Sequence, residues 1–431
     1  MKLMQPPSNL PTPKKIIYLD YLRLFACLGV FACHLWVGGI LPNASNVTKN
    51  LSNLADECLG IKGDSLYRCG FDSLFLFPSN SGDHLLFNFF NFVFGLGYQA
   101  VHLFFILSGF GLTLSALLVE KKTDRIRWFG FIKKRFIRLY PSYWLILAIY
   151  LLLNFFQYDS FLGLLKTYVK GAIFLDVIPA TWYIPILLQL YLLFPFLFYF
   201  LKKLSIKNFL LLSLLVKIVS SAIIITTSLL AFDKILGLGY GGLAPGGIAL
   251  TRLFEFCFGM AIAKYWFTHE RSVDAFTVFQ KPKAIILGIF LECLGIFLSL
   301  KYTAIRFINH DIPVGLFISD VFIGIGIFII SLNLVFLVDG FLKSKNKAWL
   351  DLISNGTYEA YLIHGIVLSY FLTLLIKPSL QFLSSTPSYL IVCLLYLIIL
   401  LIFSSLTLSL GCWLFNLKSY LLQKWSLLFN L

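Results

Sequence analysis

The chain has 431 residues, of which 59% are hydrophobic and 13% are charged, and its mean hydropathy is +0.86. A soluble protein of this length could not keep so much apolar surface away from water, so the composition excludes a soluble globular fold. The formal net charge of +15 suggests an anionic partner, and the placement of the cations indicates which kind. Apolar stretches of about 20 residues recur, each long enough to cross a bilayer as a helix. The sequence therefore predicts an all-α, polytopic transmembrane helical bundle.

Ten spans are expected from these apolar stretches. They cover residues 16–40, 96–118, 140–157, 182–201, 208–231, 248–267, 284–300, 315–338, 352–376 and 388–411. Together they form one transmembrane domain over 16–411, with a tail over 1–15 before it and a tail over 412–431 after it. Because the number of spans is even, both tails are expected on the same side of the membrane.

The basic residues divide unevenly between the two sides. Of the 35 Lys and Arg, 23 fall on the side of the tails, in the tails, in the connections there or at the adjoining end of a span, and nine fall on the opposite side. The rule that positive charge stays inside then places both tails in the cytosol, together with a basic loop over 119–139. The expected location is the plasma or inner membrane, or a secretory-pathway membrane in a eukaryote. The cations are thus explained by topology and by the lipid bilayer, and no nucleic acid is expected as a partner.

The first outer loop, over 41–95, is the longest polar segment. It contains Cys58 and Cys69, which either form a disulfide on the oxidising side of the membrane or are two unrelated thiols. Three Asn-x-Ser/Thr sequons begin at Asn43, Asn46 and Asn50, and only a eukaryotic cell would glycosylate them. The end of the loop is aromatic and too short to span again, which favours either a place at the membrane interface or a re-entrant segment.

Three polar residues lie in the first span. Asp20 and Arg23 are separated by three positions and are expected to pair near the cytosolic end. Arg23 and His34 are eleven positions apart, which returns both side chains to nearly the same helix face, about 16 Å apart along the axis. An arginine inside a membrane is costly and usually marks a functional path. His34 is either a packing residue or a general base for a hydroxyl, and its alignment with Arg23 favours the base.

The second span and the basic loop carry the next candidates. Ser108 and Gly109 are small, which lets another helix or a slim ligand approach the backbone, and packing is the preferred role for Ser108. Arg135 and Arg138 share a helix face just before Tyr140 and suit a phosphorylated nucleotide in the cytosol. The alternative for these two guanidinium groups is a patch for anionic lipids.

The later spans contain further polar side chains. Trp182 opens the fourth span, and Arg252 and Glu255 form a second pair three positions apart in the sixth. His364, in the ninth span, is either a group for proton transfer or acceptor binding, or a packing residue. Glu359 lies five positions before it and is expected on a different face. The chain has no phosphate-binding glycine loop, no dinucleotide fingerprint and no zinc-type histidine spacing, so neither a metal nor a bound cofactor is expected.

These residues together resemble the acyltransferase-3 family of integral-membrane O-acyltransferases. The similarity follows the order of the chain through six segments: Asp20-x-x-Arg23 with His34, Phe104–Phe110 (FFILSGF), Arg135-x-x-Arg138-Leu-Tyr-Pro, Trp182–Pro195, Arg252–Met260 and Tyr361–His364. Two departures concern the acceptor. His102 stands where many members have an acidic residue, and the segment around Trp182 lacks the histidine or glutamate often found there.

The resemblance implies transfer of an acyl group, usually acetyl, from cytosolic acyl-CoA to a hydroxyl of a glycan or glycolipid on the far side of the membrane. Acetyl-CoA would be the donor substrate. Arg135 and Arg138 would hold its phosphates, Arg23 would guide the thioester, and His34 would deprotonate the acceptor or briefly carry the acyl group. The residues expected to support the site or face the acceptor are Asp20, His102, Ser108, Trp182, Arg252, Glu255 and His364.

A different class of function, a transporter or exporter of a lipid-linked or small polar substrate, would also explain buried charges in ten spans. Transporters often contain an internal repeat with paired broken helices, and this sequence has no convincing repeat. The acyltransferase hypothesis is therefore preferred.

Overall fold

The structure is a computed structural model. It describes residues 17–36, 89–90, 92–157, 160–174, 177–178, 181–229, 248–269, 276, 278–299, 304–307, 310–313, 316–342, 348–376, 378 and 389–429. Cys58, Cys69 and the three sequons lie outside these residues, so the disulfide and the glycosylation sites stay predictions.

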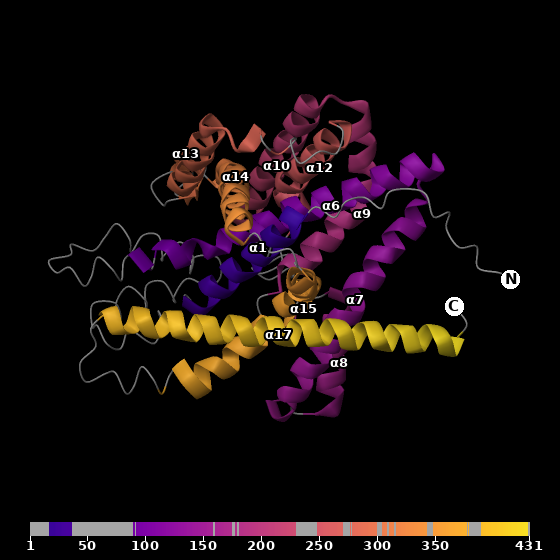
Figure 1. Ribbon diagram of the computed structural model, residues 1–431, viewed down its shortest axis with the longest axis vertical. Coiled ribbons are helices and arrows are strands. Elements are labelled where there is room, and N and C mark those ends of the chain that lie inside the picture. The colour runs from indigo at the N-terminus through magenta and orange to yellow at the C-terminus, as the bar shows by residue number, and fades with distance from the viewer. Residues whose placement is uncertain are drawn as a thin grey trace.

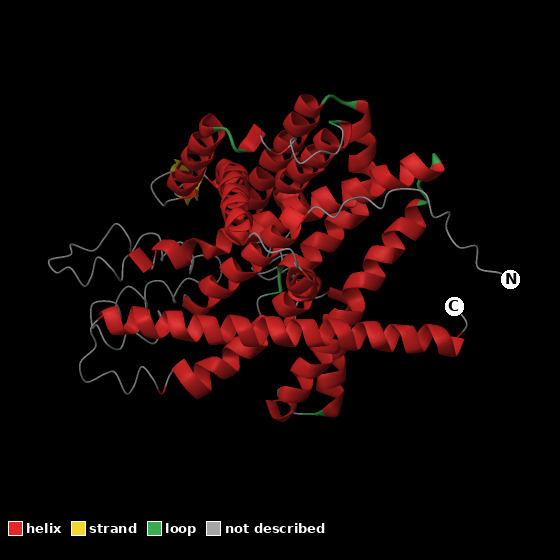
Figure 2. Ribbon diagram, in the orientation of Figure 1, coloured by secondary structure: helices red, strands yellow, loops and turns green. Residues whose placement is uncertain are grey.

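The described chain is almost entirely helical (Figures 1 and 2). The helices are α1 (Ile17–Leu35), η3 (Leu96–Gln99), α6 (Ala100–Thr123), α7 (Trp128–Leu153), η4 (Phe155–Gln157), α8 (Phe161–Phe174), α9 (Tyr183–Lys203), α10 (Ile206–Leu229), η5 (Ala249–Arg252), α12 (Leu253–Thr268), α13 (Pro282–Ser299), α14 (Leu316–Leu342), α15 (Ala348–Phe371), η8 (Leu372–Ile376) and α17 (Tyr389–Phe429). A short antiparallel hairpin of β1 (Ala304–Phe307) and β2 (His310–Pro313) precedes α14.

The all-α polytopic fold is confirmed, because a helix covers each of the ten expected spans. Among the described residues, eight helices are long and apolar enough to cross a membrane. The two further expected spans correspond to α12 and α13. α12 has 16 residues and follows directly on η5, whereas α13 has 18. The protein is therefore a multi-pass membrane protein.

Three helices differ from the expected boundaries. The basic segment 119–139, expected as a loop, is mostly helical, because α6 continues to Thr123 and α7 begins at Trp128. The turn between them uses Asp124 in a left-handed conformation, with φ of 55°. α17 continues through most of the expected tail over 412–431. The expected spans stop where charged residues begin. A helix that leaves the bilayer can continue through charged residues, so α6, α7 and α17 extend beyond their expected spans.

α8 was not expected. Its 14 residues make it about 21 Å long, which is too short to span a bilayer. Apolar side chains such as Phe161, Leu162 and Ile173 are exposed on it, and in Figure 1 it lies at the opposite edge of the molecule from α13 and α14.

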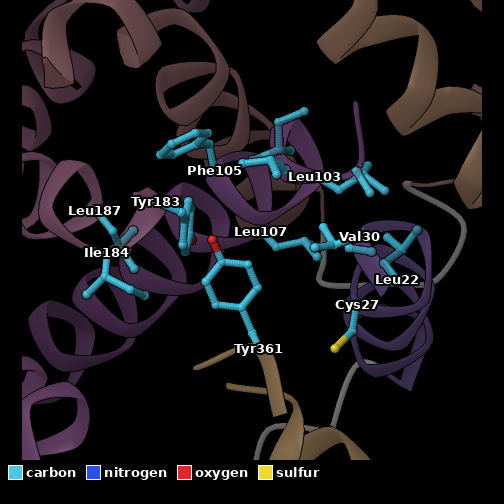
Figure 3. Packing of buried hydrophobic residues seen from close by; sticks show 14 of the residues in the cluster. Leu22, Cys27, Val30, Leu103, Phe105, Leu107, Tyr183, Ile184, Leu187 and Tyr361 are labelled. Atoms are coloured by element: carbon cyan, nitrogen blue, oxygen red, sulfur yellow. The ribbon is translucent and has the colours of Figure 1, made fainter. Parts of the chain in front are cut away.

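The pairing of helices agrees with an alternating path through the membrane. α1 and α15 run parallel, because Asp20 contacts Ser354 and His34 contacts His364 further along both helices. α17 packs along α15 and runs antiparallel to it, because Gly356 lies against Cys412 and Phe371, further along α15, contacts Phe403, earlier in α17. α1, α6, α9 and α15 surround the centre of the core, where Tyr361 lies between side chains of α1 and of α9 (Figure 3).

Two glycines let α6 and α12 touch through their backbones. A Cβ atom added at Gly109 would lie 2.0 Å from the carbonyl oxygen of Phe256, and one added at Gly259 would lie 1.9 Å from that of Ile106. No side chain fits at either position without separating the helices. The expected packing role of Gly109 is therefore confirmed, whereas a Cβ at Gly111 would meet nothing within 4 Å.

We expect Gly109→Ala to destabilise the protein by about 1–3 kcal/mol, the usual effect of overpacking a tight contact. The melting temperature in detergent measures this effect. Gly111→Ala, two positions along the same helix, is the matched control and should melt like the native protein. Equal melting temperatures for the two variants would show that α6 and α12 do not pack through Gly109.

Candidate active site

Two histidines from distant parts of the chain form a pair. His34 lies near the end of α1, and its Nδ1 atom is 2.9 Å from Nε2 of His364 on α15. The two ring centroids are 4.9 Å apart. His364 is completely buried, whereas His34 is half-buried. The sequence named both residues as candidates for proton transfer, and the structure brings them together.

The partners of His364 assign the tautomers of the pair. Its Nδ1 atom lies within hydrogen-bond distance of the carbonyl oxygen of Tyr361, which can only accept, so this nitrogen carries the hydrogen. In the neutral ring Nε2 is then an acceptor, and Nδ1 of His34 must donate to it. The lone pair of His34 therefore lies on Nε2. A buried ring thus orients a more exposed one, which is the arrangement of a general base and its supporting partner.

The other end of α1 carries the expected ion pair. Arg23 donates to Oδ1 of Asp20 at 2.9 Å, and the hydroxyl of Ser354 donates to the same oxygen at 2.6 Å. Asp20 is buried, whereas a third of the Arg23 side chain is exposed. Asp20 therefore holds the guanidinium group of Arg23 in place while leaving part of it accessible.

Arg135 and Arg138 lie on α7, in its first three turns. Arg138 is exposed, and the guanidinium carbon of Arg135 lies 4.6 Å above the ring of Phe131. Both arginines, together with Arg23, interact electrostatically with the hydroxyl of Tyr191, which is buried on α9. The three guanidinium groups named from the sequence therefore lie within electrostatic range of one residue, Tyr191.

Tyr191 is a site residue that was not singled out in the sequence. It stands two positions after Gln189 in an otherwise apolar helix, and polar groups in such a helix are the signal that would have identified it.

Tyrosines fill the space between the arginines and the histidine pair. The hydroxyl of Tyr183 donates to the carbonyl oxygen of Phe104 at 3.2 Å and so accepts from Ser108 at 2.9 Å. The ring of Tyr361 packs edge-on against Tyr183 at 5.7 Å and lies 5.3 Å from the ring of His364. Ser108 also interacts with Tyr191. Ser108 therefore has a polar role in addition to its small size.

A second polar cluster, which we call the charged cluster, joins α6, α10, α12 and α14. It consists of His102, Lys217, Arg252, Glu255 and Asp320. Arg252 lies 3.5 Å from Glu255, as its spacing predicted, but its closer partner is Asp320 at 2.6 Å. His102 contacts Glu255 at 3.2 Å and lies 3.7 Å from Asp320. Lys217 completes the cluster with a contact of 3.4 Å to Asp320.

The span expected over 208–231 contains Lys217, but neither Lys217 nor Asp320 is singled out by the sequence. Each places a charge within an apolar stretch, and such charges are the signal that could have identified both residues.

Trp182 connects the charged cluster with the centre of the core. Its side chain is 40% exposed, and the guanidinium carbon of Arg252 lies 5.9 Å above its ring. The next residue, Tyr183, points to Ser108 instead. The first residues of α9 therefore contact both polar regions.

A comparison with known proteins identifies the family of this chain. No curated protein and no solved structure matches the chain. The model of the acyltransferase-3 family, described as an acyltransferase domain, matches residues 16–407. This match includes both histidines, the three arginines around Tyr191 and the whole charged cluster. The chain therefore belongs to the acyltransferase-3 family of membrane acyltransferases.

Proposed function

We propose that the protein transfers an acetyl group from cytosolic acetyl-CoA to a hydroxyl of a glycan or glycolipid on the opposite side of the membrane. The observation that carries this proposal is the pair of His34 and His364, whose contacts place the lone pair of His34 on Nε2. Arg23, on the same helix, supplies positive charge from a position about 16 Å along the axis from that of His34. One helix thus connects a donor region with a proton acceptor.

The donor region consists of Arg23, Arg135 and Arg138 around Tyr191. Guanidinium groups bind phosphates in a forked, charge-assisted geometry, and coenzyme A carries several phosphates. Arg135 and Arg138 would hold these phosphates, and Arg23, fixed by Asp20, would guide the thioester toward the core. The positive-inside rule supports a cytosolic position for this region, with both chain termini in the cytosol.

The chemistry needs one proton acceptor. Nε2 of His34 takes the proton of the acceptor hydroxyl while the hydroxyl oxygen attacks the thioester carbonyl carbon. The carbon–sulfur bond then breaks, and the coenzyme A thiolate leaves with the proton that His34 held. The products are an O-acetyl ester and free coenzyme A. His364 takes no proton in this scheme and serves to orient His34.

The acceptor region is proposed at the charged cluster and Trp182. Sugars present many hydroxyl groups and apolar ring faces, which suit carboxylates and cations beside an exposed aromatic ring. His102, Arg252 and Glu255 would then contact the acceptor or position groups that do. Trp182 would provide the aromatic face.

An assay with labelled acetyl-CoA tests the proposal on the purified protein in lipid nanodiscs. Glycans and glycolipids are offered as acceptors, and both the labelled product and free coenzyme A are measured. Equal release of coenzyme A and labelling of one acceptor is the expected result. Movement of a substrate across vesicles without consumption of acetyl-CoA would instead support a transporter and overturn the proposed function.

A further inference from the structure

A buried ion pair joins three helices next to the donor region. Lys418 of α17 donates to Oε1 of Glu359 on α15 at 2.5 Å, and Ser142 of α7 donates to the same oxygen at 2.7 Å. Glu359 is 1% exposed, and Lys418 is 8% exposed. A single carboxylate oxygen therefore connects α7, α15 and α17.

This contact sits on the face of α7 that carries the donor arginines. Arg135, Arg138 and Ser142 are spaced by three and then four positions, so they follow one another along one side of the helix. A second contact lies close by, because the hydroxyl of Tyr358 donates to the carbonyl oxygen of Leu139 at 3.1 Å. Two neighbouring residues of α15 thus fix α7 beside Arg138.

The same helix, α15, reaches the other parts of the proposed site. Ser354 holds Asp20, the partner of Arg23, and His364 holds His34. Between these two contacts lie Tyr358 and Glu359. The distance between the donor arginines and the histidine pair therefore depends on how α7 is seated on α15.

Charge explains why Lys418 is part of this contact. A buried carboxylate needs a paired cation, since an unpaired one is strongly unfavourable in a membrane bundle. Lys418 lies on the part of α17 that extends beyond the last expected span, so it brings the cation to Glu359 from the far end of the chain.

We propose that Glu359 and Lys418 are positioning residues for the acyl donor. Their ion pair holds the Glu359 carboxylate against Ser142, and this fixes the rotation of the α7 face that carries Arg135 and Arg138. The proposal rests on the proposed function, because it takes these arginines as the donor-binding groups. Neither residue contacts the substrate or the reacting atoms.

The first test is Ser142→Ala, which removes one hydrogen bond and leaves both charges paired. The KM for acetyl-CoA should rise about 3- to 10-fold, the effect of a typical hydrogen bond, while the KM for the acceptor stays the same. Ser213→Ala is the matched control, because Ser213 is also buried but bonds the backbone of its own helix, α10. The control should leave both KM values unchanged.

The second test is a double-mutant cycle. Lys418→Met should raise the KM for acetyl-CoA by about 10-fold or more, because it leaves a buried carboxylate without its cation. Adding Glu359→Gln should bring the KM back to within about 3-fold of the native value, since a glutamine oxygen still accepts from Ser142 without carrying charge. Melting temperatures measured alongside separate this effect from a loss of stability.

The two proposals fail in different ways. A native protein that neither consumes acetyl-CoA nor labels an acceptor overturns the proposed function, and the donor-positioning role with it. An active native protein overturns the positioning role alone if Ser142→Ala leaves the KM for acetyl-CoA unchanged. The positioning role is also overturned if Lys418→Met changes only the melting temperature.

Discussion

Replacing His34 with alanine is expected to lower the rate of acyl transfer, kcat, by about 10²- to 10⁴-fold, the usual contribution of a positioned general base. The reason is local. The contacts of His364 place the lone pair of His34 on Nε2, and an alanine offers no proton acceptor there. The rate of coenzyme A release from acetyl-CoA, measured at saturating acceptor, gives the effect directly.

Two further variants make this test specific. His364→Ala should lower kcat less, by about 10- to 100-fold, because the base remains but is no longer oriented. His269→Ala is the control, since His269 is exposed at the end of α12 and its hydrogen bonds among the described residues go to Thr268 and Tyr265. Membrane insertion and melting temperature should be preserved in all three variants. Native activity in His34→Ala would remove this histidine from the mechanism.

The double variant Arg135→Ala/Arg138→Ala is expected to raise the KM for acetyl-CoA by about 10- to 100-fold, because each lost charge-assisted contact to a phosphate weakens binding. The KM for the acceptor should not change. Exposure of Arg138 keeps the expected effect below that of a fully buried pair. Steady-state kinetics at fixed acceptor and varied acetyl-CoA measure it.

The matched control uses neighbouring cations on the same helix. Lys133 and Lys134 are exposed and precede Arg135 directly. The double variant Lys133→Ala/Lys134→Ala removes the same charge and should leave the KM for acetyl-CoA within about twofold of the native value. If both double variants raise the KM equally, this end of α7 acts as a general basic surface, as an anionic-lipid patch would, and the arginines do not form a specific site.

The elements that the sequence predicted well are those set within one helix. The ten expected spans depend only on runs of apolar residues, and all ten have helices. The pairing of Asp20 with Arg23 depends on a spacing of three positions, and the structure has it at 2.9 Å. The same logic separated Glu359 from His364, which contact different helices. Helical periodicity is sufficient for each of these predictions.

Contacts between different helices could not be predicted from helical periodicity. The sequence named His34 and His364 separately, but nothing in their spacing indicates that α1 and α15 bring them together. In the same way, spacing along one helix does not indicate that Lys217 and Asp320 form one cluster with the predicted pair of Arg252 and Glu255. Rotation and crossing of neighbouring helices decide such contacts, and these depend on small residues such as Gly109 rather than on periodicity.

The expected helix boundaries were also wrong where charged residues begin, because the helices are longer than the apolar stretches. α7 was expected to start at residue 140, yet its first three turns carry the cations, and α17 is 41 residues long where 24 were expected to span. At about 1.5 Å per residue, α17 is about 60 Å long, twice the thickness of the hydrocarbon core. Hydropathy predicts where a helix leaves the hydrocarbon core. The helix itself continues as long as its backbone hydrogen bonds are made.

The parallel contact between α1 and α15 has a consequence for the biogenesis of the protein. His34 is inserted with the first span, but its partner arrives only with the ninth, 330 positions later in synthesis. A chain arrested at any earlier point lacks His364, the residue that orients His34 in the proposed mechanism. On that mechanism the active arrangement is acquired late, after nearly the entire polypeptide has been threaded into lipid.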